Sequence, residues 1–199
     1  GLDALHIKRE DLSGTALGGN KIRQIELIMA DARAEGADTL ITTAGVQSNF
    51  CRALAACAAK SGLHCRLLLR GSGDEAVTGN LMLMRLFGAE IAFIPALDPW
   101  SDAVVERLER EAEAVRGSGG RPLIVHLPGR TAARAAQAWV DGAGELDAQW
   151  RAAGIDPDAL FVAAGSGLTA AGLILGLKAL RRRCRVHVVS VQQPDRHRL

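Results

Sequence analysis

The chain has 199 residues, of which 48% are hydrophobic and 23% are charged. This composition is typical of a globular protein with enough apolar residues for one core or two small ones. The formal net charge is only +2, so we expect no nucleic acid partner. No apolar stretch of about 18 residues and no charged-then-apolar signal segment occurs, which favours a cytoplasmic protein with no membrane partner.

Four cysteines, at positions 51, 57, 65 and 184, form no CxxC pair and do not alternate with histidines at metal-ligand spacing. We therefore expect no metal site and a reducing compartment. The chain opens on a strand-like apolar run, Ala4–Lys8, stops soon after another strand, and contains no tyrosine. We expect it to be a piece of a longer protein.

Beyond that first run, helical and strand-like patterns alternate. The patterns predict a helix from Lys21 to a C-capping Gly36, a strand over Thr39–Thr43, an alanine-rich helix ending near Gly62, a strand over His64–Leu69, a helix over Asn80–Phe87, a strand over Ile91–Ile94, a helix over Asp102–Val115, a strand over Leu123–His126, a helix over Ala132–Gln149, a buried strand over Leu160–Ala163, a helix over Ala170–Leu180 and a strand over Val186–Val191. Strands separated by helices indicate βαβ units, so the expected fold is α/β with parallel sheets flanked by helices.

Two strand–loop–helix junctions carry polar groups where ligands bind in open parallel sheets. In the first, Ala44–Asn49, the side chains of Ser48 and Asn49 lie at a helix N-terminus, which suits an anion such as a carboxylate. The alternative is that one of them only caps the helix. The second junction, Gly165-Ser166-Gly167-Leu168-Thr169, predicts a monophosphate cradle of backbone N–H groups with two hydroxyls, or else a mere tight turn.

A third element is Gly18-Gly19-Asn20-Lys21 at the start of a helix. The positive end of the helix dipole disfavours a cation there, and with partial burial it would lower the pKa of Lys21. A lowered pKa is what an amine needs to form a Schiff base, although an exposed lysine remains the alternative. An amine, an amide and a phosphate cradle together match a cofactor that carries an aldehyde and a monophosphate.

The runs Lys8-Arg9-Glu10-Asp11-Leu12, Gly18-Gly19-Asn20-Lys21-Ile22-Arg23 and Gln47-Ser48-Asn49 resemble the motifs of the D-cysteine desulfhydrase and 1-aminocyclopropane-1-carboxylate deaminase family. That family is a branch of the tryptophan-synthase-β-like, fold type II enzymes that use pyridoxal 5′-phosphate (PLP). The resemblance is clearest over residues 5–95 and 158–191. It implies a small domain, residues 25–131, inserted into a larger PLP-binding domain that includes residues 1–24 and 132–199, and it implies a homodimer.

The resemblance also implies roles for individual residues. Lys21 would form the internal aldimine and then move the proton, and Asn49 would bond the 3-hydroxyl of PLP. Gly165, Ser166, Gly167, Leu168 and Thr169 would hold its phosphate. Ser48, with Gln47 and Asn49, would receive the substrate carboxylate, and Ser48 would also lie close to the chemistry in the deaminase subgroup.

This sequence departs from the family pattern at three places. Phe50 stands where the family has His, and Leu168 stands where it has Gly. Leucine would be strained there if the position needs a positive φ or a close approach of the phosphate. The stretch from His126 to Arg134 replaces the family's Gly-Gly-Ser loop. The active-site tyrosines and the partner of the pyridine nitrogen fall outside this chain.

The function expected from these motifs is a PLP-dependent lyase or deaminase acting on a small amino acid, with β-elimination from a cysteine-type substrate ahead of cyclopropane ring opening. Two alternatives remain open. One is a non-catalytic or divergent PLP-binding paralogue with an altered substrate pocket, and the other is an α/β protein that binds a different phosphate compound.

Overall fold

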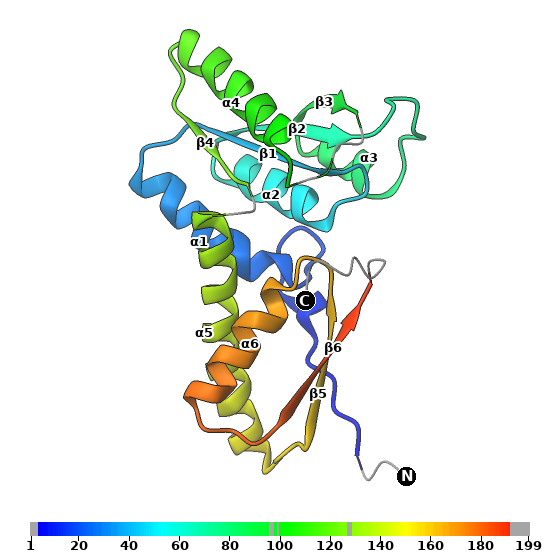
Figure 1. Ribbon diagram of the computed structural model, residues 1–199, viewed down its shortest axis with the longest axis vertical. Helices are drawn as coiled ribbons and strands as arrows, with labels where there is room; N and C mark the ends of the chain where they lie inside the picture. Colours follow the sequence, from blue (N-terminus) through cyan, green and yellow to red (C-terminus); the bar gives the residue numbers. More distant parts are fainter. Residues whose placement is uncertain (1–3, 96–97, 99, 127–128, 192–199) are drawn as a thin grey trace. The chain divides into compact units, whose positions relative to one another are not determined.

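The computed structural model describes residues 4–95, 98, 100–126 and 129–191. The chain divides into two compact units, Gly1–Pro128 and Gly129–Leu199, which are described separately (Figure 1). The division lies three positions from the expected boundary at residues 131 and 132, but residues 1–24 group with the first unit. The insertion of a small domain into a larger one stays a prediction.

In the first unit the described strands form a four-stranded parallel sheet in the order β3-β2-β1-β4 (Figure 1). The elements, in chain order, are the 3-10 turn η1 (Glu10–Leu12), α1 (Lys21–Ala34), β1 (Thr39–Gly45), α2 (Asn49–Lys60), β2 (His64–Arg70), α3 (Gly79–Leu86), β3 (Glu90–Ile94), α4 (Asp102–Gly117) and β4 (Pro122–Ile124). They follow the expected alternation with shifts of a few residues at their ends.

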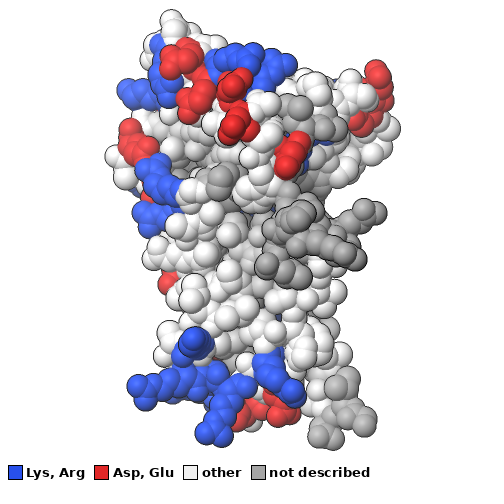
Figure 2. Space-filling view, in the orientation of Figure 1, with Lys and Arg blue, Asp and Glu red and all other residues white. Residues whose placement is uncertain are grey.

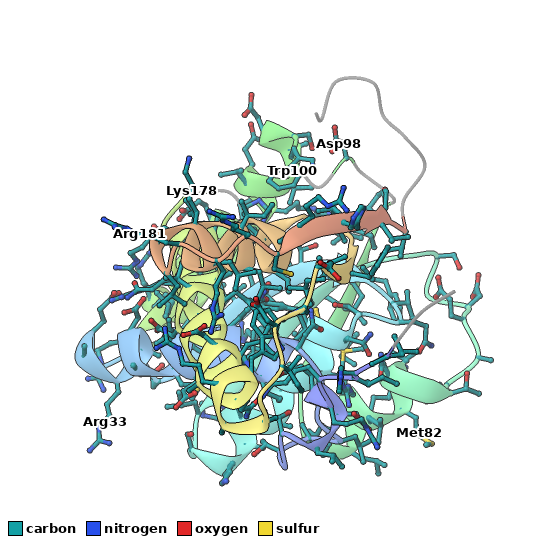
Figure 3. The ribbon with its side chains drawn as sticks, turned by 90° about the horizontal axis from the view of Figure 1, so that it is seen from below. Arg33, Met82, Asp98, Trp100, Lys178 and Arg181 are labelled. Atoms are coloured by element: carbon teal, nitrogen blue, oxygen red, sulfur yellow. The ribbon has the colours of Figure 1, made fainter. Side chains whose placement is uncertain are left out.

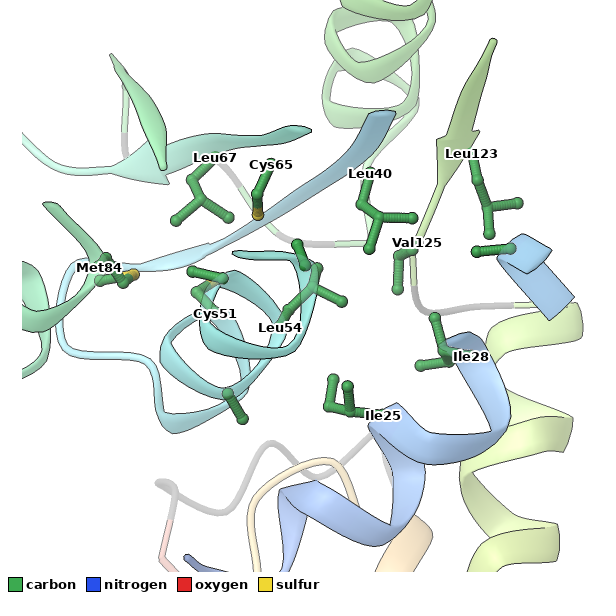
Figure 4. Packing of buried hydrophobic residues seen from close by; sticks show 14 of the residues in the cluster. Ile25, Ile28, Leu40, Cys51, Leu54, Cys65, Leu67, Met84, Leu123 and Val125 are labelled. Carbon is green, nitrogen blue, oxygen red and sulfur yellow. The ribbon is translucent and has the colours of Figure 1, made fainter. Parts of the chain in front are cut away.

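Apolar side chains cover both faces of this sheet. On one face, side chains of α1, α2 and α3 pack against Leu40, Leu67 and Leu123 of the strands (Figure 4). On the other, Val104 and Leu108 of α4 pack against Ile41 and Leu68. Burial on both faces explains why consecutive residues of these strands are apolar, such as Leu40-Ile41 in β1 and Leu67-Leu68-Leu69 in β2.

The predicted C-cap at Gly36 is confirmed. Gly36 has φ 64° and its N–H bonds the carbonyl of Arg33, while the N–H of Ala37 bonds the carbonyl of Ala32. This is the Schellman arrangement, in which the residue after the helix needs the left-handed conformation that glycine adopts without strain. It ends α1 and turns the chain toward β1.

The second unit consists of α5 (Arg130–Ala153), β5 (Ala159–Ala164), α6 (Leu168–Ala179) and β6 (Arg185–Ser190), with β5 and β6 parallel. Trp139 and Leu146 of α5 pack against Leu173 and Leu177 of α6. The helices approach closely because α6 carries glycines there: a Cβ on Gly172 would lie 2.2 Å from the carbonyl oxygen of Ala136.

Two expectations about strands were wrong. Residues 4–8 form no strand; Leu5 and Ile7 are 75% and 73% exposed, and an apolar run without a bonded neighbour does not become a strand. The strand Leu160–Ala163 exists within β5 but is not buried on both faces, because Phe161 is 68% exposed and stacks on His187 of the neighbouring strand.

A basic run, Arg181-Arg182-Arg183, follows the end of α6. Arg181 follows the helix end with φ 55°, and Arg182 pairs with the buried Asp147 and with Asp156. Figure 2 shows lysine and arginine side chains gathered with acidic ones at this end of the second unit. In the described part of the chain no helix is both long and apolar enough to cross a membrane.

Candidate active site

Polar residues of the first unit follow the carboxyl ends of neighbouring strands. Gly45 at the end of β1 is in register with Arg70 at the end of β2, so the loops after these strands leave the same edge of the sheet. Gln47 and Ser48 lie in the short loop between β1 and α2. In parallel sheets this edge is where ligands bind.

Ser48 is the N-cap of α2, and its Oγ accepts a hydrogen bond from the backbone N–H of Cys51 at 3.2 Å. The capping alternative is therefore confirmed for Ser48. Capping uses the oxygen as an acceptor and leaves the hydroxyl hydrogen able to donate to a ligand. Asn49 is the first residue of the helix and is exposed, so it does not cap.

Asn80, which the sequence reasoning missed, joins the two amides of the Gln47-Ser48-Asn49 motif. Its Nδ2 donates to the backbone oxygen of Gln47 and to Oδ1 of Asn49, both at 2.9 Å, and its backbone N–H donates to Oε1 of Gln47 at 2.8 Å. Because the oxygen of Asn49 accepts from Asn80, the Nδ2 of Asn49 is oriented as the free donor. The only local signal for Asn80 is its place at the start of α3.

Lys21 begins α1 after a loop of unusual backbone conformation. Ala16, Leu17, Gly18 and Gly19 all have positive φ, of 51°, 65°, 68° and 106°. The N–H of Gly19 bonds the carbonyl of Glu10 at 2.8 Å. Arg23 donates to both carboxylate oxygens of Glu10, at 2.8 and 2.9 Å, which ties the turn η1 to the first turn of α1.

The amine of Lys21 has the properties expected from the sequence. Its side chain is half-buried, and burial lowers its pKa below the usual 10.5. No described residue forms an ion pair or hydrogen bond with it. A cation would be favoured at the other end of α1, where Arg33 points away from the ribbon (Figure 3). Lys21 is thus an amine that loses its proton more readily than an exposed lysine.

His126 and Arg70 add two nitrogen groups that the sequence reasoning did not single out for this edge of the sheet. His126 follows β4, and its Nε2 is buried without a hydrogen-bond partner among the described residues. Burial, and then the charge of Arg70, lower the pKa of His126 and favour the neutral imidazole. In the sequence, both residues could have been recognised by their positions at the carboxyl ends of predicted strands.

The predicted phosphate loop lies in the second unit. Gly167 adopts φ 82° as the N-cap of α6 and makes no side-chain cap hydrogen bond. The positive end of the helix dipole at this terminus favours an anion. Ser166 is exposed, and a Cβ on Gly167 would meet no atom within 4 Å. The arrangement leaves room for a phosphate.

The positive φ that would strain Leu168 does not occur. Leu168 is the first residue of α6, and among the described non-glycine residues only Ala16, Leu17 and Arg181 have positive φ. The left-handed conformation falls on Gly167 instead, so a leucine at position 168 costs the backbone nothing.

The other two departures also have structural counterparts. Phe50 lies partly buried against the core of the first unit, so its ring adds to apolar packing. In the altered stretch from His126 to Arg134, residues 127 and 128 lie outside the described residues. Gly129, with φ 93°, precedes α5.

Comparison with known proteins agrees with this chemistry. The family described as "Pyridoxal-phosphate dependent enzyme" matches residues 1–198. A D-cysteine desulfhydrase of Klebsiella pneumoniae is 38% identical over 195 residues, covering 95% of this chain and 57% of that protein. A D-cysteine desulfhydrase of Salmonella choleraesuis is 41% identical over 182 residues, covering 88% and 53%.

Among solved structures, one described as an "ACC deaminase homologue" matches with a TM-score of 0.80 at 36% identity, covering 91% of this chain and 54% of that one. The chain therefore spans about half the length of the relatives it matches. The likeness extends over both units, and it includes the parallel sheets flanked by helices.

Proposed function

The chain belongs to the pyridoxal-phosphate dependent enzymes, and from that premise we propose that the whole protein is a lyase that removes the β-substituent of a small amino acid such as D-cysteine. The observation that carries the proposal is Lys21, a half-buried amine with a lowered pKa and no described partner. The names of the two desulfhydrase relatives support the substrate class.

The residues present fit the cofactor. The ε-amine of Lys21 would bind its aldehyde carbon, the Nδ2 of Asn49 would donate to its ring oxygen, and the loop from Gly165 to Thr169 would bind its phosphate through backbone N–H groups and hydroxyls. When bound, the cofactor supplies an electron sink for the bonds at the substrate Cα. The open space around Gly167 and the uncapped start of α6 support the phosphate assignment.

The chain's own residues would then handle the substrate. The hydroxyl of Ser48 and the amides of Gln47 and Asn49 would bind the substrate carboxylate at the N-terminus of α2, where the helix dipole favours a negative charge. The amine of Lys21 would accept and return the proton at Cα, which requires the neutral form that a lowered pKa favours.

A second candidate reaction is the ring opening of 1-aminocyclopropane-1-carboxylate. It is favoured by the match to the structure described as an ACC deaminase homologue. The same carboxylate site would serve both reactions, so the two differ in the bond that is broken. We also propose a cytoplasmic homodimer with the small domain inserted in the larger one.

The first experiment tests cofactor binding by the purified whole protein. We expect PLP to give a visible absorption band that survives in Lys60→Ala and is absent from Lys21→Ala. Borohydride reduction and peptide mapping should locate the cofactor on Lys21 rather than on Lys8, Lys60 or Lys178. A protein that stays colourless with added PLP would overturn the proposal.

The second experiment separates the reactions. Release of sulfide, pyruvate and ammonia is measured with D-cysteine and L-cysteine, and release of ammonia with 1-aminocyclopropane-1-carboxylate. Sulfide release that is lost in Lys21→Ala supports the desulfhydrase assignment. Ammonia from the cyclopropane substrate alone would favour the deaminase. Cofactor binding without turnover of any substrate would identify a non-catalytic paralogue.

A further inference from the structure

We propose that Arg52 is a positioning residue for Lys21, because its guanidinium holds the loop Ala16–Gly19 in the conformation that starts helix α1. The inference rests on the proposed role of Lys21. It concerns an arginine that lies one helical turn after Ser48 and Asn49 on α2 and therefore connects the amine-bearing helix with the proposed carboxylate site.

The guanidinium of Arg52 is bonded to the backbone of this loop. Its Nη1 donates to the carbonyl of Ala16, and its Nη2 donates to the carbonyl of Gly18 at 3.1 Å. The residue is only 6% exposed, and its Nε is buried without a partner among the described residues. In the described chain no carboxylate pairs with it. A buried cation is costly unless it is bonded, so the two carbonyls are its compensation.

The loop needs hydrogen bonds from other parts of the chain because its backbone is strained. Ala16 and Leu17 carry Cβ atoms yet have φ of 51° and 65°, a region that such residues rarely adopt. Strained backbone persists where the surroundings over-determine it. The side chain of Leu17 is 72% exposed and does not anchor the loop by packing. The bonds from Arg52 fall on both sides of Leu17, at Ala16 and Gly18.

Lys21 follows this strained segment by only two residues, with Asn20 as the N-cap between them. Freeing Ala16 and Gly18 would let the first turn of α1 fray and would give the amine of Lys21 more contact with water. Arg52 thereby couples the position of α2 to the position of the amine. It would act through Lys21 without touching substrate or cofactor.

The test measures the chemical reactivity of Lys21 in the cofactor-free whole protein. Competitive acetylation with peptide mapping gives the rate at Lys21 relative to Lys60 as a function of pH. The variants are Arg52→Met, which removes the donors and the charge, and Arg52→Lys, which keeps the charge and a donor group. Arg66→Met is the matched control, because Arg66 pairs with Glu90 and Glu111 in the same unit and does not bond the loop.

In Arg52→Met we expect the pKa of Lys21 to rise toward its usual value, so that less of the amine is neutral at a given pH and acetylation of Lys21 relative to Lys60 falls severalfold. The rate of PLP uptake should fall by a similar factor. Arg52→Lys should partly restore the reactivity of Lys21 and the rate of PLP uptake. Arg66→Met should leave both quantities at wild-type values, even if its Tm falls as much as that of Arg52→Met.

Unchanged reactivity of Lys21 in a folded Arg52→Met protein would overturn the inference. If Arg52→Met does not fold, the same measurements on Arg52→Lys decide, and values equal to the wild type would overturn it. Because acetylation is followed without cofactor, its result does not depend on the proposed function. A wild-type protein that does not take up PLP would overturn the proposed function, but the effect of Arg52 on the reactivity of Lys21 could still be measured.

Discussion

The α-carbon of Gly18 lies so close to the backbone of Asp11 that a Cβ on Gly18 would sit 2.0 Å from the carbonyl oxygen of Asp11. The neighbour is main chain and cannot rotate away as a side chain would. Gly18 also has φ 68°, so two independent constraints require glycine there. This contact packs the turn η1 against the loop that leads to Lys21.

We predict that Gly18→Ala is strongly destabilising and Gly14→Ala only mildly so. Gly14 has φ 80° in the same loop, but a Cβ there would meet nothing within 4 Å. Gly14→Ala is the control, and its free energy of unfolding should fall by about 1–2 kcal/mol because of the left-handed conformation alone. Gly18→Ala adds overpacking and should lose roughly 2–5 kcal/mol in total. Urea denaturation measures both, and equal losses would contradict the close contact.

The second prediction concerns the pH dependence of stability in the cofactor-free protein. Burial lowers the pKa of Lys21 in the folded state, whereas the unfolded chain keeps the usual value of 10.5. Between these two pKa values the unfolded state binds more protons, so the wild type gains stability as pH rises through that window. Lys21→Met lacks this dependence. Its free energy of unfolding should exceed that of the wild type at neutral pH, and this difference should shrink as pH approaches 10.5.

Urea denaturation between neutral and alkaline pH measures the difference between wild type and Lys21→Met. Lys60→Met, at the exposed end of α2, is the matched control. If the gap between Lys21→Met and wild type stays constant with pH, the amine of Lys21 is not desolvated in the folded protein.

The third prediction concerns Asn80. Asn80→Asp keeps the shape but cannot donate to the backbone oxygen of Gln47 or to Oδ1 of Asn49, so Asn49 loses its orientation. We expect the dissociation constant for PLP to rise roughly fivefold to tenfold, as the loss of about 1–1.4 kcal/mol implies. Titration of the visible band measures it.

Asn80→Ala should give a similar loss, since it removes the same donor. Gln149→Ala removes an exposed amide from α5 and serves as the control. Wild-type affinity in both Asn80 variants would show that the amide of Asn49 needs no support from α3.

The fourth prediction concerns the helix pair in the second unit. Gly172→Ala would place a Cβ 2.2 Å from the carbonyl oxygen of Ala136 and 2.5 Å from the Cβ of Trp139. Overpacking should lower the free energy of unfolding by about 1–3 kcal/mol. Gly144→Ala, on α5 with nothing within 4 Å, should instead stabilise by up to about 1 kcal/mol through helix propensity. Thermal or urea unfolding measures the change in the free energy of unfolding, which should have opposite signs in the two variants.

The sequence by itself determined the order of helices and strands, the C-cap at Gly36 and the family. Periodicity, capping and the motifs around Lys21 and Asn49 are properties of short segments, and local sterics and hydrogen bonding decide them. This is why the predicted elements from residue 21 onward correspond to the observed ones. The family motifs are likewise contiguous runs.

Only the tertiary structure decided which distant residues support those motifs. Asn80 meets Asn49, and Arg52 meets Gly18, across 31 and 34 positions of the chain. The tertiary structure also showed that Gly167 is the left-handed residue of the phosphate loop and that β5 is exposed at Phe161. Such contacts depend on how whole helices and strands pack, and no local pattern carries that information.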